Sequence, residues 1–78
     1  MERRAVPRKL VLMFGTIEFA DSKINCIVGN MSIAGAALDV INPNDVPERF
    51  TLVFKADNVR IPCHTIWRKE NWIGVAFD

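Results

Sequence analysis

Two short groups of polar residues have the types and spacing that recognise phosphates and nucleobases. Arg4 and Arg8 form an Arg-x-x-x-Arg pattern near the N-terminus, and Asn30, Ser32 and Gly35 form an Asn-x-Ser-x-x-Gly pattern further along. A guanidinium group binds phosphate oxygens or a guanine edge through paired hydrogen bonds, and its flat face stacks on a purine. The first group therefore suits an anionic ligand or partner.

The second group supplies different chemistry. Asn30 has a carbonyl acceptor and an amide donor, so it can pair with a guanine Watson–Crick edge or brace a loop. Ser32 can donate to a phosphate or cap a backbone group, and Gly35 allows either a positive φ angle or a close approach to the backbone. The same residue types also form ordinary turns. Their order after the arginine pair is what favours a binding role.

Basic residues are concentrated at the start of the chain. The whole chain has a formal net charge of +1, yet residues 1–9 hold Arg3, Arg4, Arg8 and Lys9 against Glu2 alone. We expect residues 1–8 to form a flexible basic arm and residues 9–78 to form the folded body of one domain spanning residues 1–78. A solvated terminus without a partner is the alternative that the charge pattern leaves open.

Alternating hydrophobic stretches between turn signals predict an all-β fold. The six expected strands run roughly over residues 9–19, 23–28, 36–41, 49–55, 58–68 and 72–77. The alternation breaks near Gly15, where we expect a bulge or bend, and it places Cys63 and Trp67 on one face. Because six short antiparallel strands need covered edges, we predict a small antiparallel barrel, possibly split. A two-sheet sandwich is the alternative.

The sequence gives little support to catalysis, a metal site or a membrane span. Ser32 lacks the Gly-x-Ser-x-Gly context of a nucleophile elbow, and His64 could act as a base only beside a nucleophile. Cys26, Cys63 and one histidine cannot fill a zinc site, so we expect no enzyme activity, metal or cofactor. The apolar runs are too short to insert into a membrane, and no secretion signal is recognisable. We therefore expect a cytoplasmic protein with reduced thiols.

Taken together, the motifs and their order resemble the PilZ domain family. The resemblance runs from Glu2 to Phe77 and includes Trp67 near the end of the fifth expected strand and the closing Gly-Val-Ala-Phe strand. It implies a six-stranded barrel that binds the bacterial second messenger cyclic di-GMP and transmits the bound state to a partner protein.

The resemblance also assigns residues to the expected site. The family's two motif arginines correspond to Arg4 and Arg8, and its loop motif corresponds to Asn30, Ser32 and Gly35. Arg3 falls where a further basic contact is often found, and Trp67 falls where some members place an aromatic or apolar group against the ligand.

Two other functions compete with this one. A PilZ-like adaptor would bind a protein partner without the nucleotide. A small barrel that binds RNA or single strands would need basic residues interleaved with aromatics along its strands. Here the basic residues gather on the arm and tyrosine is absent, so we expect no nucleic-acid partner.

Overall fold

A computed structural model describes residues 13–78, and the predicted arm at residues 1–8 lies outside the described residues. The described chain consists of six antiparallel strands and one short 3₁₀ turn, which confirms the all-β prediction. The elements are β1 (Met13–Phe19), β2 (Ser22–Met31), β3 (Gly35–Asp39), η1 (Pro43–Asp45), β4 (Arg49–Phe54), β5 (Arg60–Lys69) and β6 (Trp72–Phe77).

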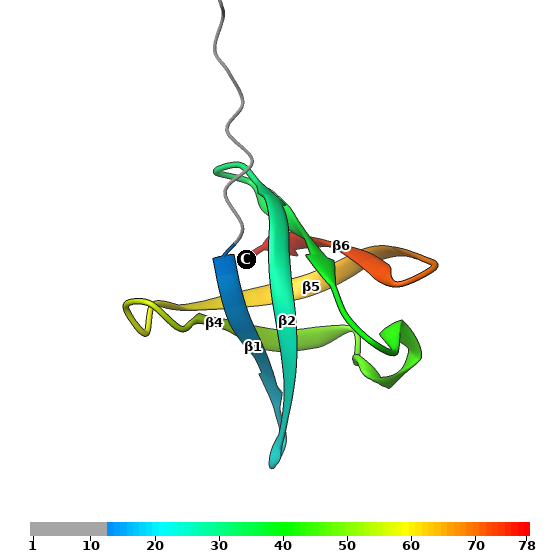
Figure 1. The fold of residues 1–78 in the computed structure, drawn as a ribbon, viewed down its shortest axis with the longest axis horizontal. Coiled ribbons are helices and arrows are strands. Elements are labelled where there is room, and N and C mark those ends of the chain that lie inside the picture. The colour runs from blue at the N-terminus through cyan, green and yellow to red at the C-terminus, as the bar shows by residue number, and fades with distance from the viewer. Residues whose placement is uncertain (1–12) are drawn as a thin grey trace, which may run out of the picture.

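The strands form a closed barrel in the order β1-β2-β3-β6-β5-β4, and β1 pairs with β4 to complete the ring (Figure 1). Each of these pairings is antiparallel. Closure pairs both edges of every described strand, and this solves the exposed-edge problem that six short strands face. The barrel is therefore closed, rather than split or arranged as a two-sheet sandwich.

Side chains from every second strand position point inward and form the core of the barrel. Four large side chains are fully buried, namely Ile17, Leu38, Leu52 and Ile73. Each of these side chains contributes about 1.5–3 kcal/mol through removal from water. The core also contains the thiols of Cys26 and Cys63, both of which are free and buried.

The predicted turns join the strands as short hairpins. Two-residue turns connect β1 to β2 and β5 to β6, as the pairings Phe19↔Ser22 and Lys69↔Trp72 show. The φ angle is positive at Ala20 in the first turn (50°) and at Glu70 in the second (58°). A positive φ at these positions gives the turn a twist that matches the twist of the strands.

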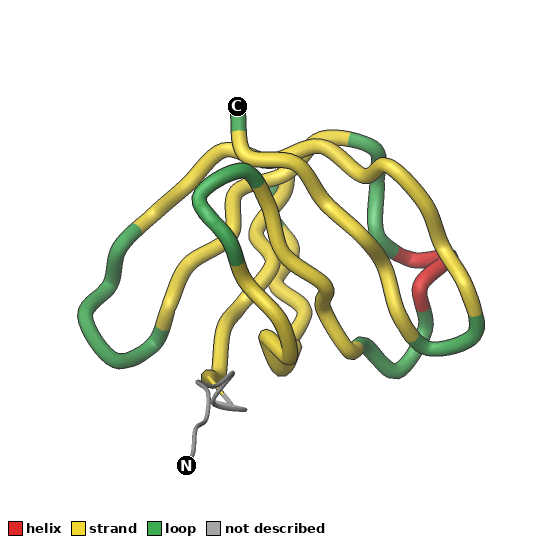
Figure 2. The backbone as a smooth tube through the Cα atoms, turned by 90° about the horizontal axis from the view of Figure 1, so that it is seen from above, coloured by secondary structure: helices red, strands yellow, loops and turns green. Residues whose placement is uncertain are grey.

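The segment between β3 and β4 leaves the ladder, as its two prolines predict, and forms the η1 turn drawn in red in Figure 2. Arg68 from β5 holds this segment against the barrel. Its Nε donates to the carbonyl oxygen of Pro43 (3.2 Å) and its Nη2 to that of Val46 (2.6 Å). Val46 is itself buried at 1% exposure, so the segment closes one side of the core.

The prediction of a bulge near Gly15 is wrong. The register of β1 is unbroken against both neighbours, and Gly15 instead leaves room for the carbonyl oxygen of Val53, which would lie 3.2 Å from an added Cβ. The irregularities lie between Val28 and Asn30 in β2 and between Thr65 and Trp67 in β5. The first of these keeps β2 paired to Met31, three residues beyond its predicted end.

Candidate ligand-binding site

The loop motif lies where β2 turns into β3. Asn30 is exposed near the end of β2, and Gly35 is the first residue of β3. The backbone N–H of Ser32 donates to the carbonyl of Gly35 (2.9 Å), and the Ser32 Oγ accepts from the backbone N–H of Ala34 (3.1 Å). The serine thus closes the loop on itself and fixes the separation of the two strand ends.

Gly35 is required by packing between strands and not by a turn conformation. Its φ angle is not positive. A Cβ at this position would come well under 3.0 Å from the carbonyl oxygen of Val75 on β6. Of the two roles that the sequence left open for this glycine, close approach is therefore the one observed. The approaching backbone belongs to the neighbouring strand.

Four residues in register form a row across the outside of the barrel. Asn30 on β2 pairs with Ala37 on β3, Ala37 pairs with Gly74 on β6, and Gly74 pairs with Trp67 on β5. Directly paired residues of antiparallel strands lie on the same face. The two middle residues are small, so the row forms a trough with an amide at one end and an indole at the other.

Trp67 lies on the opposite face from the one that its spacing predicted. Simple alternation placed it with Cys63, which is fully buried in the core. The irregularity between Thr65 and Trp67 adds one residue, Ile66, and reverses the alternation. Trp67 consequently points outward with 47% of its surface exposed.

The trough belongs to a hollow of about 350 Å³ on the barrel surface. The structure brings four of the predicted site residues together there, namely Asn30, Ser32, Gly35 and Trp67. The hollow is also lined by Met31, Ala34, Ala36, Ala37, Ile66, Gly74 and Val75. None of these lining residues carries a charge, so the described part of the site offers polar groups and an aromatic surface but no cation.

The predicted arginines Arg3, Arg4 and Arg8 lie outside the described residues. The barrel nevertheless determines where that part of the chain is attached. Met13 opens β1 and pairs with Val28, two residues before Asn30 on the antiparallel strand β2. The chain therefore enters the barrel at the end where β2 carries the loop motif (Figure 1).

A second hollow, of about 790 Å³, lies at this same end of the barrel. Its lining is mostly apolar and consists of Met13, Phe14, Met31, Phe54, Lys55, Ala56, Asp57, Val59 and Ile61. Met31 lines both hollows, so the two are neighbours. The larger hollow contains none of the motif residues described above and has few groups that could orient a polar ligand. The smaller hollow is therefore the better candidate for a nucleotide site.

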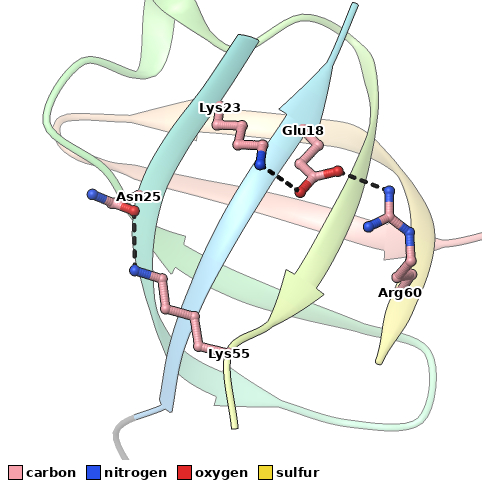
Figure 3. A network of polar contacts seen from close by, with 5 residues as sticks. All are labelled: Glu18, Lys23, Asn25, Lys55 and Arg60. Carbon is pink, nitrogen blue, oxygen red and sulfur yellow. Dashed lines mark hydrogen bonds and ion pairs between the residues drawn. The ribbon is translucent and has the colours of Figure 1, made fainter. Parts of the chain in front are cut away.

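The strands β1, β2 and β5 and the turn after β4 carry a separate polar network of Glu18, Lys23, Asn25, Lys55 and Arg60 (Figure 3). Glu18 accepts a hydrogen bond from the guanidinium of Arg60 (2.7 Å) and lies 3.9 Å from the ammonium of Lys23. Lys55 donates to the amide oxygen of Asn25 (3.2 Å). These cations are engaged by neighbouring side chains. They do not form the row of free cations and aromatics that single-stranded nucleic acid requires.

A second group of ionisable contacts lies outside the hollow. His64 Nδ1 lies 2.6 Å from the carboxylate of Asp78, and Arg49 lies 3.5 Å from the same carboxylate. Burial raises the pKa of Cys26 to about 12 and that of Cys63 to about 11. Both thiols are therefore protonated and poor nucleophiles at neutral pH.

The described residues provide neither a cluster of metal ligands nor a membrane-spanning helix. Residues 13–78 contain no group of three or more histidine, cysteine, aspartate or glutamate side chains placed to hold a metal ion. Within the same range, no helix is long and apolar enough to cross a membrane.

Comparison with known families identifies the fold. Residues 2–78 match the model of the PilZ domain, which covers nearly the whole chain. The chain belongs to the PilZ family. PilZ domains are generally associated with cyclic di-GMP binding and are typically binding modules without catalytic activity. Comparisons with curated proteins and with solved structures gave no match.

Sequence reasoning missed the middle of the trough in this PilZ domain, although one signal was present. The two-residue turn at Glu70-Asn71 sets the register of the β5–β6 hairpin and places Trp67 opposite Gly74. Ala37 was harder to find, because its pairing with Gly74 joins strands far apart in sequence. No local pattern predicts that pairing.

Proposed function

We propose that this PilZ domain is a receptor for cyclic di-GMP whose ligand occupies the hollow on the outside of β2, β3, β6 and β5. The observation that carries the proposal is the meeting of Asn30, Ser32, Gly35 and Trp67 in one hollow. These residues come from separate elements, and a chance set of turn residues would have no reason to share a concave surface with an exposed indole.

The hollow supplies the groups for a base, and the arm supplies the charge. Asn30 offers an amide to a guanine edge, and Trp67 offers an aromatic surface on which a base can stack. The distance between these two residues is roughly 14 Å along the sheet, three interstrand spacings. That span suits a ligand with two bases better than a single small anion.

Arg3, Arg4 and Arg8 are the proposed partners of the ligand phosphates. Arg8 stands five residues before Met13, and five extended residues reach up to about 17 Å. Because Met13 pairs with Val28, two residues before Asn30, we propose that an extended segment of this length brings Arg8 to the hollow. The lack of charge in the hollow makes these arginines necessary for affinity, since two phosphates would otherwise be bound without a cation.

Ordering of residues 1–8 over the ligand is the proposed signal. Neutralisation by the phosphates removes the repulsion between the arginines, and the ordered segment then presents a new surface to a partner protein. The free, buried thiols suit the reducing cytoplasm, where we place this receptor. We expect no nucleic-acid partner, no membrane insertion and no catalytic step.

An adaptor function without nucleotide is the second candidate. Exposed apolar side chains near the loop motif favour it, since Ile33 is fully exposed and Met31 is 49% exposed. Such side chains suit contact with a protein. Titration with cyclic di-GMP separates the two candidates, because the adaptor would release no binding heat.

Isothermal titration of the full chain with cyclic di-GMP, with GTP and cyclic AMP as controls, tests the proposal. We expect Arg4→Ala or Arg8→Ala to weaken binding by about 10- to 150-fold, which corresponds to about 1.5–3 kcal/mol for a charged hydrogen-bonding group. Arg8→Lys should also bind poorly, because lysine lacks the paired donors and the stacking plane.

Lys23→Ala is the matched control for loss of one positive charge. Its side chain is 72% exposed and lies beside Glu18, away from the hollow. We expect its titration curve to match that of the parent. If the parent, Arg4→Ala and Arg8→Ala bind cyclic di-GMP with equal affinity, the arm is not part of the binding site. If the parent releases no binding heat, the adaptor function is the remaining candidate.

A further inference from the structure

The indole of Trp67 rests on a glycine of the neighbouring strand. A Cβ at Gly74 would fall well under 3.0 Å from the Cε2 and Nε1 atoms of Trp67. The ring therefore occupies the space that any side chain at position 74 would need. Gly74 is buried beneath the ring, while nearly half of the indole surface stays exposed at the edge of the hollow.

This contact determines where the exposed part of the indole lies. The ring sits over β6 in the same row as Ala37 and Asn30, so it borders the trough instead of projecting away from the barrel. A side chain at position 74 would push the ring away from this position.

The chemistry of the hollow indicates which part of a ligand the ring contacts. The lining residues carry no charge, and Asn30 and Ser32 supply the polar side chains. A phosphate would gain little there, whereas a purine base would gain a stacking surface from Trp67 and an edge partner from Asn30. An uncharged, planar group is therefore the best occupant of the trough.

We infer that Gly74 is a positioning residue, which holds the Trp67 indole as the stacking surface for one guanine base of cyclic di-GMP. The inference rests on the proposed function and adds to it the residue that sets the platform. Gly74 has no side chain and lies under the indole, so we expect its effect on binding to pass through Trp67.

The second tryptophan provides an internal control. Trp72 lies over Gly29 in a similar way, where a Cβ would come 2.6 Å from the ring. Trp72 is 37% exposed but does not line the hollow. The barrel therefore carries two tryptophan–glycine contacts, and only the one at Trp67 borders the proposed site.

Fluorescence of single-tryptophan variants tests the stacking contact. With cyclic di-GMP as the probe, we expect quenching of Trp67 emission in Trp72→Phe and little change of Trp72 emission in Trp67→Phe. Gly74→Ala should shift the Trp67 emission maximum and weaken binding by about 5- to 150-fold, the loss expected when one base–aromatic stack is removed.

A double-mutant cycle separates positioning from a general loss of structure. In a Trp67→Leu background, Gly74→Ala should cause no further loss of affinity, because the ring it acts through is absent. Trp72→Leu, the matched control for Trp67→Leu, should bind within about 2-fold of the parent, since it removes no stack. Urea unfolding confirms that each variant is folded at the titration temperature.

The outcomes distinguish the inference from the function on which it rests. If the parent and Gly74→Ala bind cyclic di-GMP with equal affinity, the proposed role of Gly74 is wrong while the receptor function still holds. An equal loss from Gly74→Ala with and without Trp67 would also overturn it, because the effect would then bypass the indole. Absence of binding by the parent itself would overturn the receptor function.

Discussion

Gly35→Ala tests the conclusion that the motif glycine is required by strand packing. The added methyl group would meet three backbone atoms of β6. The carbonyl oxygen of Val75 would lie well under 3.0 Å away, its carbonyl carbon 3.2 Å and the Cα of Ala76 3.3 Å. None of these atoms belongs to a flexible side chain, so the methyl group can be accommodated only by movement of β3 away from β6.

The cost of this movement follows from the local contacts. The strands must separate by about 1 Å to restore an ordinary carbon–oxygen distance, and overpacking of this kind costs about 1–3 kcal/mol. Two backbone hydrogen bonds at the same strand end weaken as well, Ser32 N–H to Gly35 (2.9 Å) and Phe77 N–H to Ala34 (2.9 Å). We expect a total loss of about 2–4 kcal/mol in the free energy of unfolding.

Urea unfolding followed by far-UV circular dichroism measures this loss. Gly15→Ala is the matched control, because its methyl group would meet neighbours at 3.2–3.4 Å and needs only small adjustments. We expect the control to lose clearly less stability than Gly35→Ala. If Gly35→Ala unfolds at the same urea concentration as the parent, close approach does not explain the glycine, and a direct ligand contact becomes its better explanation.

Two further predictions concern stability. Burial holds the pKa of Cys26 near 12 and that of Cys63 near 11, above the ordinary value of 9.0. The protonated thiols therefore contribute their full stabilisation below about pH 9. Above that pH, the free energy of unfolding falls by about 1.4 kcal/mol per pH unit per thiol. Urea titrations at about pH 8, 9 and 10 check this slope, which should be about halved in Cys63→Ala. Arg68→Met should cost about 1.5–3 kcal/mol, because the carbonyls of Pro43 and Val46 lose a charged donor. Thermal unfolding measures this loss, and a melting temperature equal to that of the parent would mean that the η1 segment holds itself in place.

Much of the fold could be predicted from local patterns. The closing strand Trp72–Phe77 begins and ends where its alternation and flanking turn indicate, and β4 is within one residue of its predicted end. The turns after β1, β4 and β5 were recognisable from the turn-forming residue types that interrupt the alternation. The bulges were not, because each depends on how a strand fits its partner. Gly15 resembled a bulge residue but lies in a regular ladder.

The site was only partly predictable, for a related reason. Asn30, Ser32 and Gly35 form a sequence motif, so their neighbourhood was expected, and the resemblance of the sequence to PilZ domains suggested a place for Trp67 beside them. Trp67 points outward because β5 contains an extra residue, Ile66. Simple alternation does not predict this residue and placed Trp67 on the inner face. The trough floor depends on the pairing of β3 with β6, which no nearby residues encode.

That same pairing would make the proposed binding site a late product of folding. The barrel consists of two three-stranded meanders, β1-β2-β3 and β4-β5-β6, whose internal hairpins need only short loops. The meanders join at two seams, β1 with β4 and β3 with β6. Seam formation must first overcome the entropy of closing long loops, so it is expected to be slower than hairpin formation. Since the hollow spans the β3–β6 seam, an incompletely closed chain has no hollow, and binding of the proposed ligand would report the intact barrel.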